Sequence, residues 1–206
     1  MNFILASKSP RRKEILENIG LDFTVITADA DETCFETDPE EYVKVLALRK
    51  GEAVLERLRQ SGALTPDTLI IASDTVVALE NEILGKPRDK GDAARMLRAF
   101  SGKAHRVISG VALLTPEKTA VCAEVTRVLF DTVPENEIES YIATSEPYDK
   151  AGAYAIQGFA ALWIRGIEGD YFNVVGFPLK RFADLLREEF SLSLAPLLSD
   201  KEHKIV

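Results

Sequence analysis

Isolated charged residues stand at the ends of apolar segments in this 206-residue chain, where they could do chemistry. Several cations beside a few carboxylates suit phosphate-ester chemistry with a hard metal ion, because Mg²⁺ takes carboxylate oxygens, water and phosphate oxygens. In such a site the cations neutralise the phosphates, and a carboxylate orients or deprotonates water. The cations are Arg11, Arg12, Lys50, Lys86 and Lys150, and the carboxylates are Glu32, Asp74 and Asp149.

Several other nucleotide and hydrolase sites lack their motifs in this sequence. Neither GxxxxGK[ST] nor GxGxxG occurs, so P-loop and Rossmann dinucleotide sites have no support. A GxSxG elbow is also absent, and of the two histidines, His105 and His203, the second lies near the C-terminus. A serine hydrolase is therefore disfavoured.

The first basic cluster lies in the stretch Phe3–Leu16, which predicts a short strand, a polar turn and a helix. Ser9 suits the N-cap and Pro10 the first helical position, since the first N–H groups of a helix have no intrahelical partner. Those N–H groups and the helix dipole attract anions. Arg11 and Arg12 add guanidinium forks that match phosphate or carboxylate, so this stretch predicts an anion-binding site, although ordinary surface arginines are the alternative.

Asp74 interrupts the apolar segment 68–79, and Lys50 interrupts the apolar stripe of a helix predicted from Pro39 to about Arg59. A charged group in an apolar setting is costly without a partner, so Asp74 should face a metal ion, a cation or a substrate. A turn or cap, or a bulge or strand end, is the other interpretation of Asp74. Snorkelling of the side chain to water is the other interpretation of Lys50.

Predicted strands and helices alternate along the chain, which indicates an α/β fold. The two strands predicted within 104–133 would form an antiparallel hairpin, so we expect the sheet to be mixed. We expect one domain over residues 1–190 and a C-terminal tail over 191–206. Strands are expected at 2–6, 22–28, 68–79, 81–84, 104–115, 119–133 and 160–167, and helices at 10–19, 38–59, 89–100, 134–144 and 179–190.

Composition restricts the partners of the chain. A net charge of −8 argues against stable nucleic-acid binding, and no apolar run is long enough to span a bilayer. The N-terminus lacks the pattern of a secretory signal. The two cysteines, Cys34 and Cys122, lie far apart, which favours a reducing compartment over a disulfide framework or zinc site. We therefore expect a cytoplasmic protein.

Five segments together resemble the Maf family of nucleoside triphosphate pyrophosphatases. They follow one another in the order of the family and cover residues 3 to about 190. Each alone is a weak signal, but the set is specific. The segments are LASKSPRRKEIL near the N-terminus, IIASDTVV at 70–77, GKPRD at 85–89, EPYDKAGAYAIQG at 146–158 and GDYFNVVGFPL at 169–179.

The resemblance implies an elongated α/β fold with a twisted mixed sheet and two lobes around a deep cleft, similar to the inosine triphosphate pyrophosphatases. It implies hydrolysis of a nucleoside triphosphate to the monophosphate and pyrophosphate with Mg²⁺ or Mn²⁺. Members are often homodimers and are associated with removal of non-standard nucleotides and with arrest of septum formation.

The resemblance also assigns roles to residues. It makes Asp74 the catalytic carboxylate and a metal ligand, and Glu32 a metal ligand or water-orienting group. Lys50 and Lys86 would hold phosphates in the catalytic centre. Substrate binding falls to the remaining matched positions, which are Ser9, Arg11, Arg12, Thr75, Asp149, Lys150 and Gln157.

Gln157 carries the expected base specificity. A primary amide has an acceptor and donors on one edge, which match the N3–H and carbonyl groups of uracil or thymine. The DKAGAY–IQG form resembles the subgroup acting on dTTP and UTP, or modified pyrimidine analogues, and not the one acting on 7-methyl-GTP. A purely structural amide is the alternative. Two residues depart from the family pattern: Ala155 replaces a common Gly beside the base, and Gly51 replaces a common Ala, which would weaken the helix by under about 1 kcal/mol.

Two other functions stay open. The first is a nucleotide-binding regulator of septum formation without catalysis, which the presence of Asp74, Glu32 and both lysines disfavours. The second is a nucleotidyltransferase, which the lack of a Gly-rich turn after the first strand disfavours.

Overall fold

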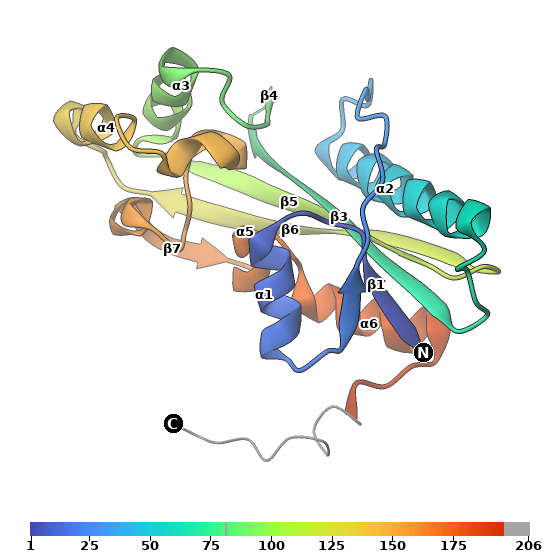
Figure 1. Ribbon diagram of the computed structural model, residues 1–206. Helices are drawn as coiled ribbons and strands as arrows, with labels where there is room; N and C mark the ends of the chain where they lie inside the picture. The colour runs from blue at the N-terminus through green and yellow to red at the C-terminus, as the bar shows by residue number, and fades with distance from the viewer. Residues whose placement is uncertain (81, 196–206) are drawn as a thin grey trace.

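The computed structural model is built around one long strand, β3 (Thr68–Leu79), at the centre of a twisted mixed sheet (Figure 1). The structure describes residues 1–80 and 82–195. Within these residues the sheet has seven strands in the order β2-β1-β3-β5-β6-β7, with β4 also paired to β3. β1 is parallel to β2 and β3, and the other pairs are antiparallel. The other strands are β1 (Asn2–Leu5), β2 (Phe23–Val25), β4 (Glu82–Leu84), β5 (Ala104–Leu114), β6 (Thr119–Phe130) and β7 (Ile164–Glu168).

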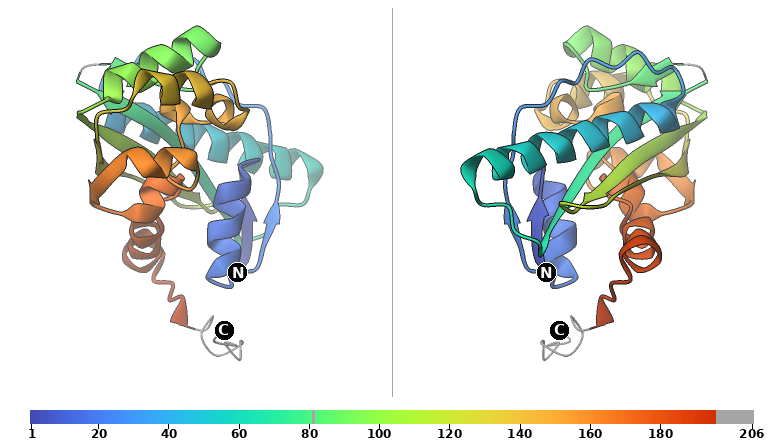
Figure 2. Two further views of the ribbon diagram at one scale, coloured as in Figure 1. Left: turned by 90° about the vertical axis from the view of Figure 1, so that its left-hand side faces the viewer. Right: turned by 90° about the vertical axis from the view of Figure 1, so that its right-hand side faces the viewer.

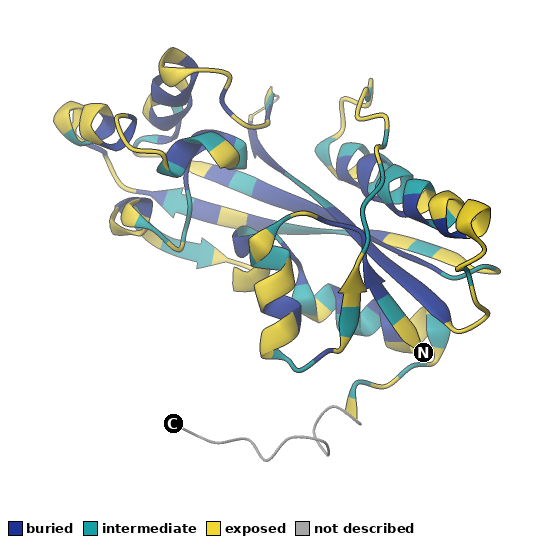
Figure 3. Cartoon of the chain, viewed as in Figure 1, coloured by how far each residue is buried: buried dark blue, intermediate teal, exposed yellow. Residues whose placement is uncertain are grey.

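Helices cover both faces of the sheet, and alternation along β3 supplies an apolar row to each face. Ile70 and Ala72 pack in the cluster under α2, whereas Leu69 and Ile71 pack in the cluster with α1 and α6. Strands β3 and β5 are mostly buried as a result (Figure 3). The α-helices are α1 (Pro10–Asn18), α2 (Pro39–Ser61), α3 (Lys90–Phe100), α4 (Glu135–Tyr141), α5 (Tyr171–Val175) and α6 (Leu179–Phe190), and the 3₁₀ helices are η1 (Glu146–Asp149), η2 (Ala151–Ala153) and η3 (Phe159–Trp163).

The core divides between the two ends of the long sheet. Leu97 and Phe100 of α3 pack with Trp163 at one end, while Leu16 of α1 and Phe182 of α6 pack at the other. Figure 1 shows these helices gathered at opposite ends of the strands, which gives the two lobes expected from the sequence.

A gap in strand pairing opens along one edge of β3. β1 pairs with β3 from Asn2–Thr68 as far as Leu5–Ile71, and β4 begins to pair with β3 only at Val77. On its other edge β3 pairs continuously with β5, and Asp74 stands opposite Gly110. The alternative of a bulge or strand end at Asp74 is therefore wrong: the pairing of β3 with β5 is regular there, and the short length of β1 leaves the other edge of β3 unpaired.

Helix α2 lies unusually close to the sheet beside this gap. A Cβ on Gly110 would lie 2.3 Å from the Val43 carbonyl oxygen, and one on Gly51 would lie 2.3 Å from Cδ1 of the buried Leu114. Gly51 was predicted to weaken α2, but its lack of a side chain also leaves room for Leu114 against the helix. Both glycines let the helix approach the strands and bring Lys50 within reach of β3.

The structure corrects several element boundaries. Residues 160–163, predicted to begin a strand, belong instead to η3 (Phe159–Trp163), and the strand β7 starts at Ile164. The predicted strand 22–28 pairs only over Phe23–Val25 before the chain leaves the sheet. Helix α5 has no counterpart in the sequence prediction, because five residues are too few to show a helical period.

The C-terminal region is only partly described. Leu192 and Leu194 pack against the cluster of α6, and the predicted tail beyond residue 195 lies outside the described residues. The division at residue 190 stays a prediction. Among the described helices, none has the length and hydropathy needed to cross a bilayer.

Candidate active site

A cleft of about 980 Å³ lies over the unpaired edge of β3. Its walls come from the β1–α1 turn, the loop after β2, helix α2, the loop after β4 and the segment 149–157. Every candidate residue from the sequence lines this cleft: Ser9, Arg11, Arg12, Glu32, Lys50, Asp74, Thr75, Lys86, Asp149, Lys150 and Gln157. The fold therefore gathers residues that are widely separated in the chain.

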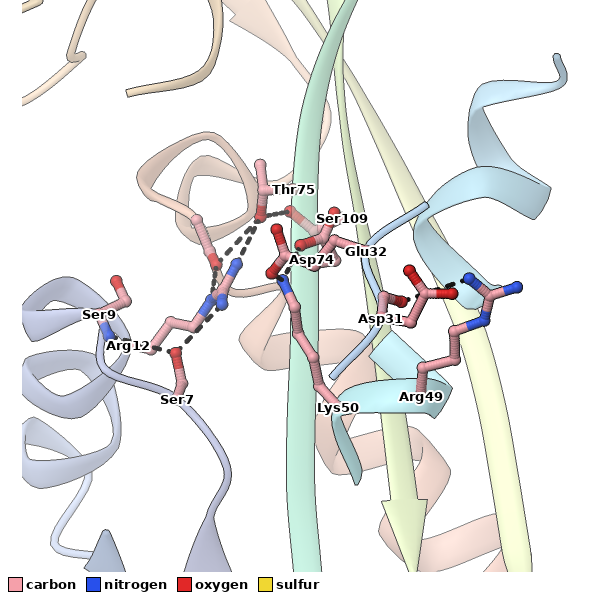
Figure 4. A network of polar contacts seen from close by, with 11 residues as sticks. Ser7, Ser9, Arg12, Asp31, Glu32, Arg49, Lys50, Asp74, Thr75 and Ser109 are labelled. Atoms are coloured by element: carbon pink, nitrogen blue, oxygen red, sulfur yellow. Dashed lines mark hydrogen bonds and ion pairs between the residues drawn. The ribbon is translucent and has the colours of Figure 1, made fainter. Parts of the chain in front are cut away.

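Lys50 joins the two predicted catalytic carboxylates. Its Nζ lies 2.6 Å from Asp74 Oδ1 and 3.0 Å from Glu32 Oε1 (Figure 4). The Asp74 side chain is only 13% exposed and that of Lys50 22%, so each offsets the cost of burying the other. The predicted partner of Asp74 is thus a cation of the chain itself, and Lys50 does not snorkel to water alone.

Arg12 makes three hydrogen bonds that tie separate elements together. It donates from Nε to the Gly176 carbonyl at 3.0 Å, from Nη1 to Ser7 Oγ at 3.1 Å and from Nη2 to Thr75 Oγ1 at 3.2 Å. Burial lowers the pKa of Arg12, and the nearby carboxylates Asp74 and Glu32 oppose that shift. Since a guanidinium has five N–H groups, donors remain for a ligand.

Thr75 extends the Arg12 network across the sheet. Its hydroxyl lies 2.8 Å from Ser109 Oγ and donates to the Gly176 carbonyl at 3.3 Å. The side chain of Thr75 is therefore fixed by β5 and by the end of α5. Ser7 and Ser109 were missed from the sequence: Ser7 lies inside the quoted first segment, but Ser109 gives no signal before the register of β3 and β5 is known.

Arg11 of α1 contacts the last residue of η1. Its Nη1 lies 3.5 Å from Asp149 Oδ2, and this contact joins α1 to residues far along the chain. Lys150 pairs with Asp149 and donates to the Glu146 carbonyl at 2.6 Å. These three predicted residues form one charged cluster on this wall.

Ser9, Lys86 and Gln157 were predicted to bind the substrate, and Ala155 was predicted to narrow the space for the base. Ser9 is the N-cap residue of α1, but its side chain makes no capping hydrogen bond. Lys86 and Gln157 are exposed on the cleft wall, and Ala155 lies two residues before Gln157 on the same wall.

The donor set at Asp74 and Glu32 fits a hard divalent ion. No group of three or more His, Cys, Asp or Glu side chains suited to a metal occurs in residues 1–80 and 82–195. Mg²⁺ does not need one, since it commonly uses one or two carboxylates and completes its shell with water and phosphate oxygens. The convergence of two carboxylates on Lys50 Nζ shows that both can reach one cation.

The comparisons with known proteins concern nearly the whole chain. A curated dTTP/UTP pyrophosphatase of Geobacillus sp. (strain WCH70) is 50% identical over 179 residues, which are 86% of this chain and 92% of that protein. One of Clostridioides difficile (strain 630) is 45% identical, covering 94% and 98%. One of Thermoanaerobacter sp. (strain X514) is 42% identical, covering 94% and 100%.

Two further comparisons concern fold and family. A solved structure of the Staphylococcus aureus Ham1 protein aligns with a TM-score of 0.42 at 16% identity, over 63% of this chain and 72% of that one. The family model described as Maf-like protein matches residues 2–189. On the strength of this match and of the curated relatives, the chain belongs to the Maf family.

Proposed function

We propose that the chain hydrolyses dTTP and UTP, together with modified pyrimidine analogues, to the nucleoside monophosphate and pyrophosphate. It would thus be a hydrolase that acts on acid anhydrides. The observation that carries the proposal is the contact of Lys50 with both Asp74 and Glu32 inside a cleft lined by further cations. Curated relatives that are 42–50% identical are named dTTP/UTP pyrophosphatases, which supports the substrate class.

Asp74 activates the water. Its carboxylate lies at the floor of the cleft, and it accepts a proton as the water oxygen attacks the α-phosphorus. The bond from that phosphorus to the bridging oxygen breaks, and pyrophosphate leaves. Lys50, which contacts Asp74 at 2.6 Å, offers positive charge together with Lys86 to the phosphate oxygens, whose negative charge grows as the bond breaks.

Cations of the first helix and of the segment after η1 bind the triphosphate. Ser9 and Arg11 offer donors at the start of α1, and Arg12 offers the N–H groups that its three protein contacts leave over. Lys150 adds positive charge near Arg11, because Asp149 contacts both side chains. Thr75 orients Arg12 by accepting one of its hydrogen bonds.

Asp74 and Glu32 are the residues that would hold Mg²⁺ or Mn²⁺. The bound ion would neutralise phosphate charge and acidify a coordinated water. The carboxylates of Asp74 and Glu32 would then contact both that ion and Lys50 Nζ.

Gln157 selects the base. Its amide offers one acceptor and two N–H donors to the pyrimidine edge, and its position on the exposed wall leaves it accessible to a ligand. Ala155 adds a methyl group to the same wall, so it narrows the space for the base compared with glycine.

A panel of nucleoside triphosphates incubated with Mg²⁺ tests the proposal, with pyrophosphate and monophosphate both measured. With dTTP or UTP as substrate we expect pyrophosphate and monophosphate in equal amounts. Purine nucleotides should give far less of both products. In water labelled with heavy oxygen, attack at the α-phosphorus places the label in the monophosphate. Label in the pyrophosphate would contradict the mechanism.

The same experiment separates the alternatives. Tight nucleotide binding without pyrophosphate release would indicate a regulator, and dependence on a second acceptor substrate would indicate a nucleotidyltransferase. The homodimer and the role in septum formation remain predictions from the family resemblance, and the cytoplasmic location remains a prediction from the composition.

A further inference from the structure

Glu32 lies on a long loop and not on a strand or helix. The loop leaves the sheet after β2 and runs past α2 to the start of that helix at Pro39 (Figure 2). The Glu32 side chain is 66% exposed, and Phe35 three residues later is 91% exposed. Ordering such a loop costs conformational entropy. If the Glu32 carboxylate is to stay beside Asp74, other contacts must therefore fix the loop backbone.

Arg49 contacts the loop on both sides of Glu32. Its Nη1 donates to the Asp31 carbonyl oxygen at 3.3 Å and to the Thr33 carbonyl oxygen at 2.5 Å. Figure 4 shows Arg49 beside Asp31. The Thr33 N–H in turn donates to Asp31 Oδ1 at 2.9 Å, which closes a tight turn around Glu32. The peptide groups that flank the carboxylate are therefore tied to α2.

Arg49 and Lys50 are neighbours in α2, and they contact different parts of the loop around Glu32. Arg49 holds the backbone around Glu32, and Lys50 holds its carboxylate at 3.0 Å while also contacting Asp74. We propose that Arg49 is a positioning residue that fixes Glu32 beside Asp74 through the carbonyls of Asp31 and Thr33. The proposal rests on the proposed function for its catalytic consequence.

Arg57 supplies a matched control. It lies eight residues further along α2 and donates to the carbonyl of Thr27 in the same loop, but well before Glu32 in sequence. Arg49→Ala and Arg57→Ala thus each remove one guanidinium from the same helix and the same loop. Only the first should disturb the site.

The kinetic test compares these variants with the wild-type chain, using dTTP and Mg²⁺. We expect Arg49→Ala to lower kcat by about 10-fold to 100-fold with a smaller change in KM, as for other residues that orient a metal ligand or catalytic group. Arg49→Lys retains a cationic donor and should recover part of the loss. In a Glu32→Gln background, Arg49→Ala should cause no further loss, because it acts through Glu32.

Amide hydrogen exchange supplies a readout that does not need turnover. Exchange over residues 29–37 should be faster in Arg49→Ala than in Arg57→Ala, with both variants folded by circular dichroism. Equal exchange in the two variants, or an equal kinetic loss with and without Glu32, would overturn the positioning role. If the wild-type chain releases no pyrophosphate, the proposed function fails, and the exchange comparison still decides whether Arg49 fixes the loop.

Discussion

Asp74 and Thr75 are neighbours in β3, yet they serve opposite faces of the sheet. Asp74 pairs with Lys50 of α2, whereas Thr75 accepts a hydrogen bond from Arg12 of α1. Both line the same cleft, because the strand edge between β1 and β4 is unpaired at this point. The Asp74–Thr75 dipeptide thus links the proposed catalytic carboxylate to Arg12.

The two adjacent arginines should separate stability from substrate binding. Arg12→Ala removes three hydrogen bonds from a charged group, so we expect the free energy of unfolding to fall by about 2–3 kcal/mol. Arg11→Ala loses one long contact to Asp149 and should change stability by less than about 0.5 kcal/mol while raising KM. Urea unfolding and dTTP kinetics on both variants measure this. Equal destabilisation by the two substitutions would contradict the bracing role of Arg12.

Gly110 should be required for both folding and activity. In Gly110→Ala the new methyl group meets the Val43 carbonyl, so α2 must move away from the sheet. We expect a loss of about 1–3 kcal/mol in the free energy of unfolding, as for other overpacked cores. The kcat should fall too, since the same helix carries Lys50. Gly166→Ala in β7 is the control, because its nearest neighbour would be Leu129 Cδ1 at 4.0 Å. Normal stability of Gly110→Ala would show that α2 is not held this closely.

Some residues of this site could be predicted from the local sequence pattern, whereas the contacts between them could not. Asp74 and Lys50 each break an apolar pattern, so the sequence alone indicates that both need partners. Their mutual contact could not be predicted without the family, because it depends on how closely α2 approaches the strands. Arg12 was predicted as a ligand for anions, and its bonds to Ser7, Thr75 and Gly176 became visible only in three dimensions.

The fold shows the same division. Long periodic elements such as β3 and α2 were predicted within a few residues, since their hydrophobic pattern and the Asp38 cap are local signals. The gap beside β3 could not be predicted, because it arises from the register of a short parallel strand. Arg49 gave no signal either: its hydrogen bonds go to backbone carbonyls, which any loop sequence offers.

Gln157 should affect substrate binding without affecting the fold. Its side chain is exposed, so Gln157→Ala should leave the unfolding curve unchanged while KM for dTTP and UTP rises by about 10-fold, equivalent to one or two hydrogen bonds. Gln60→Ala, at an exposed amide on α2, is the control. An unchanged KM for both pyrimidine nucleotides would remove Gln157 from the base site.

Stability should fall in mildly acidic solution because of a buried histidine. His105 Nε2 lies 2.7 Å from Tyr154 Oη, and burial lowers the pKa of His105 from 6.5 to about 3. The unfolded chain therefore takes up a proton near pH 6.5 that the folded protein does not take up until about pH 3. The free energy of unfolding should decline across that window by at most about 1.4 kcal/mol per pH unit.

Urea titrations at several pH values across this window test the role of His105. In His105→Gln the part of the pH slope that this residue causes should disappear, leaving the shallower slope of the carboxylates. The same slope in the wild-type chain and the variant would mean that another group controls the decline.

The most direct test of the account is pyrophosphate release by Asp74→Asn. The substitution keeps the shape of the side chain and removes the charge that Lys50 contacts at 2.6 Å. With dTTP and Mg²⁺ we expect kcat to fall by about 100-fold or more, as when a general base is lost, while the variant remains folded. Release of pyrophosphate at the wild-type rate would contradict the assignment of Asp74 as the catalytic carboxylate.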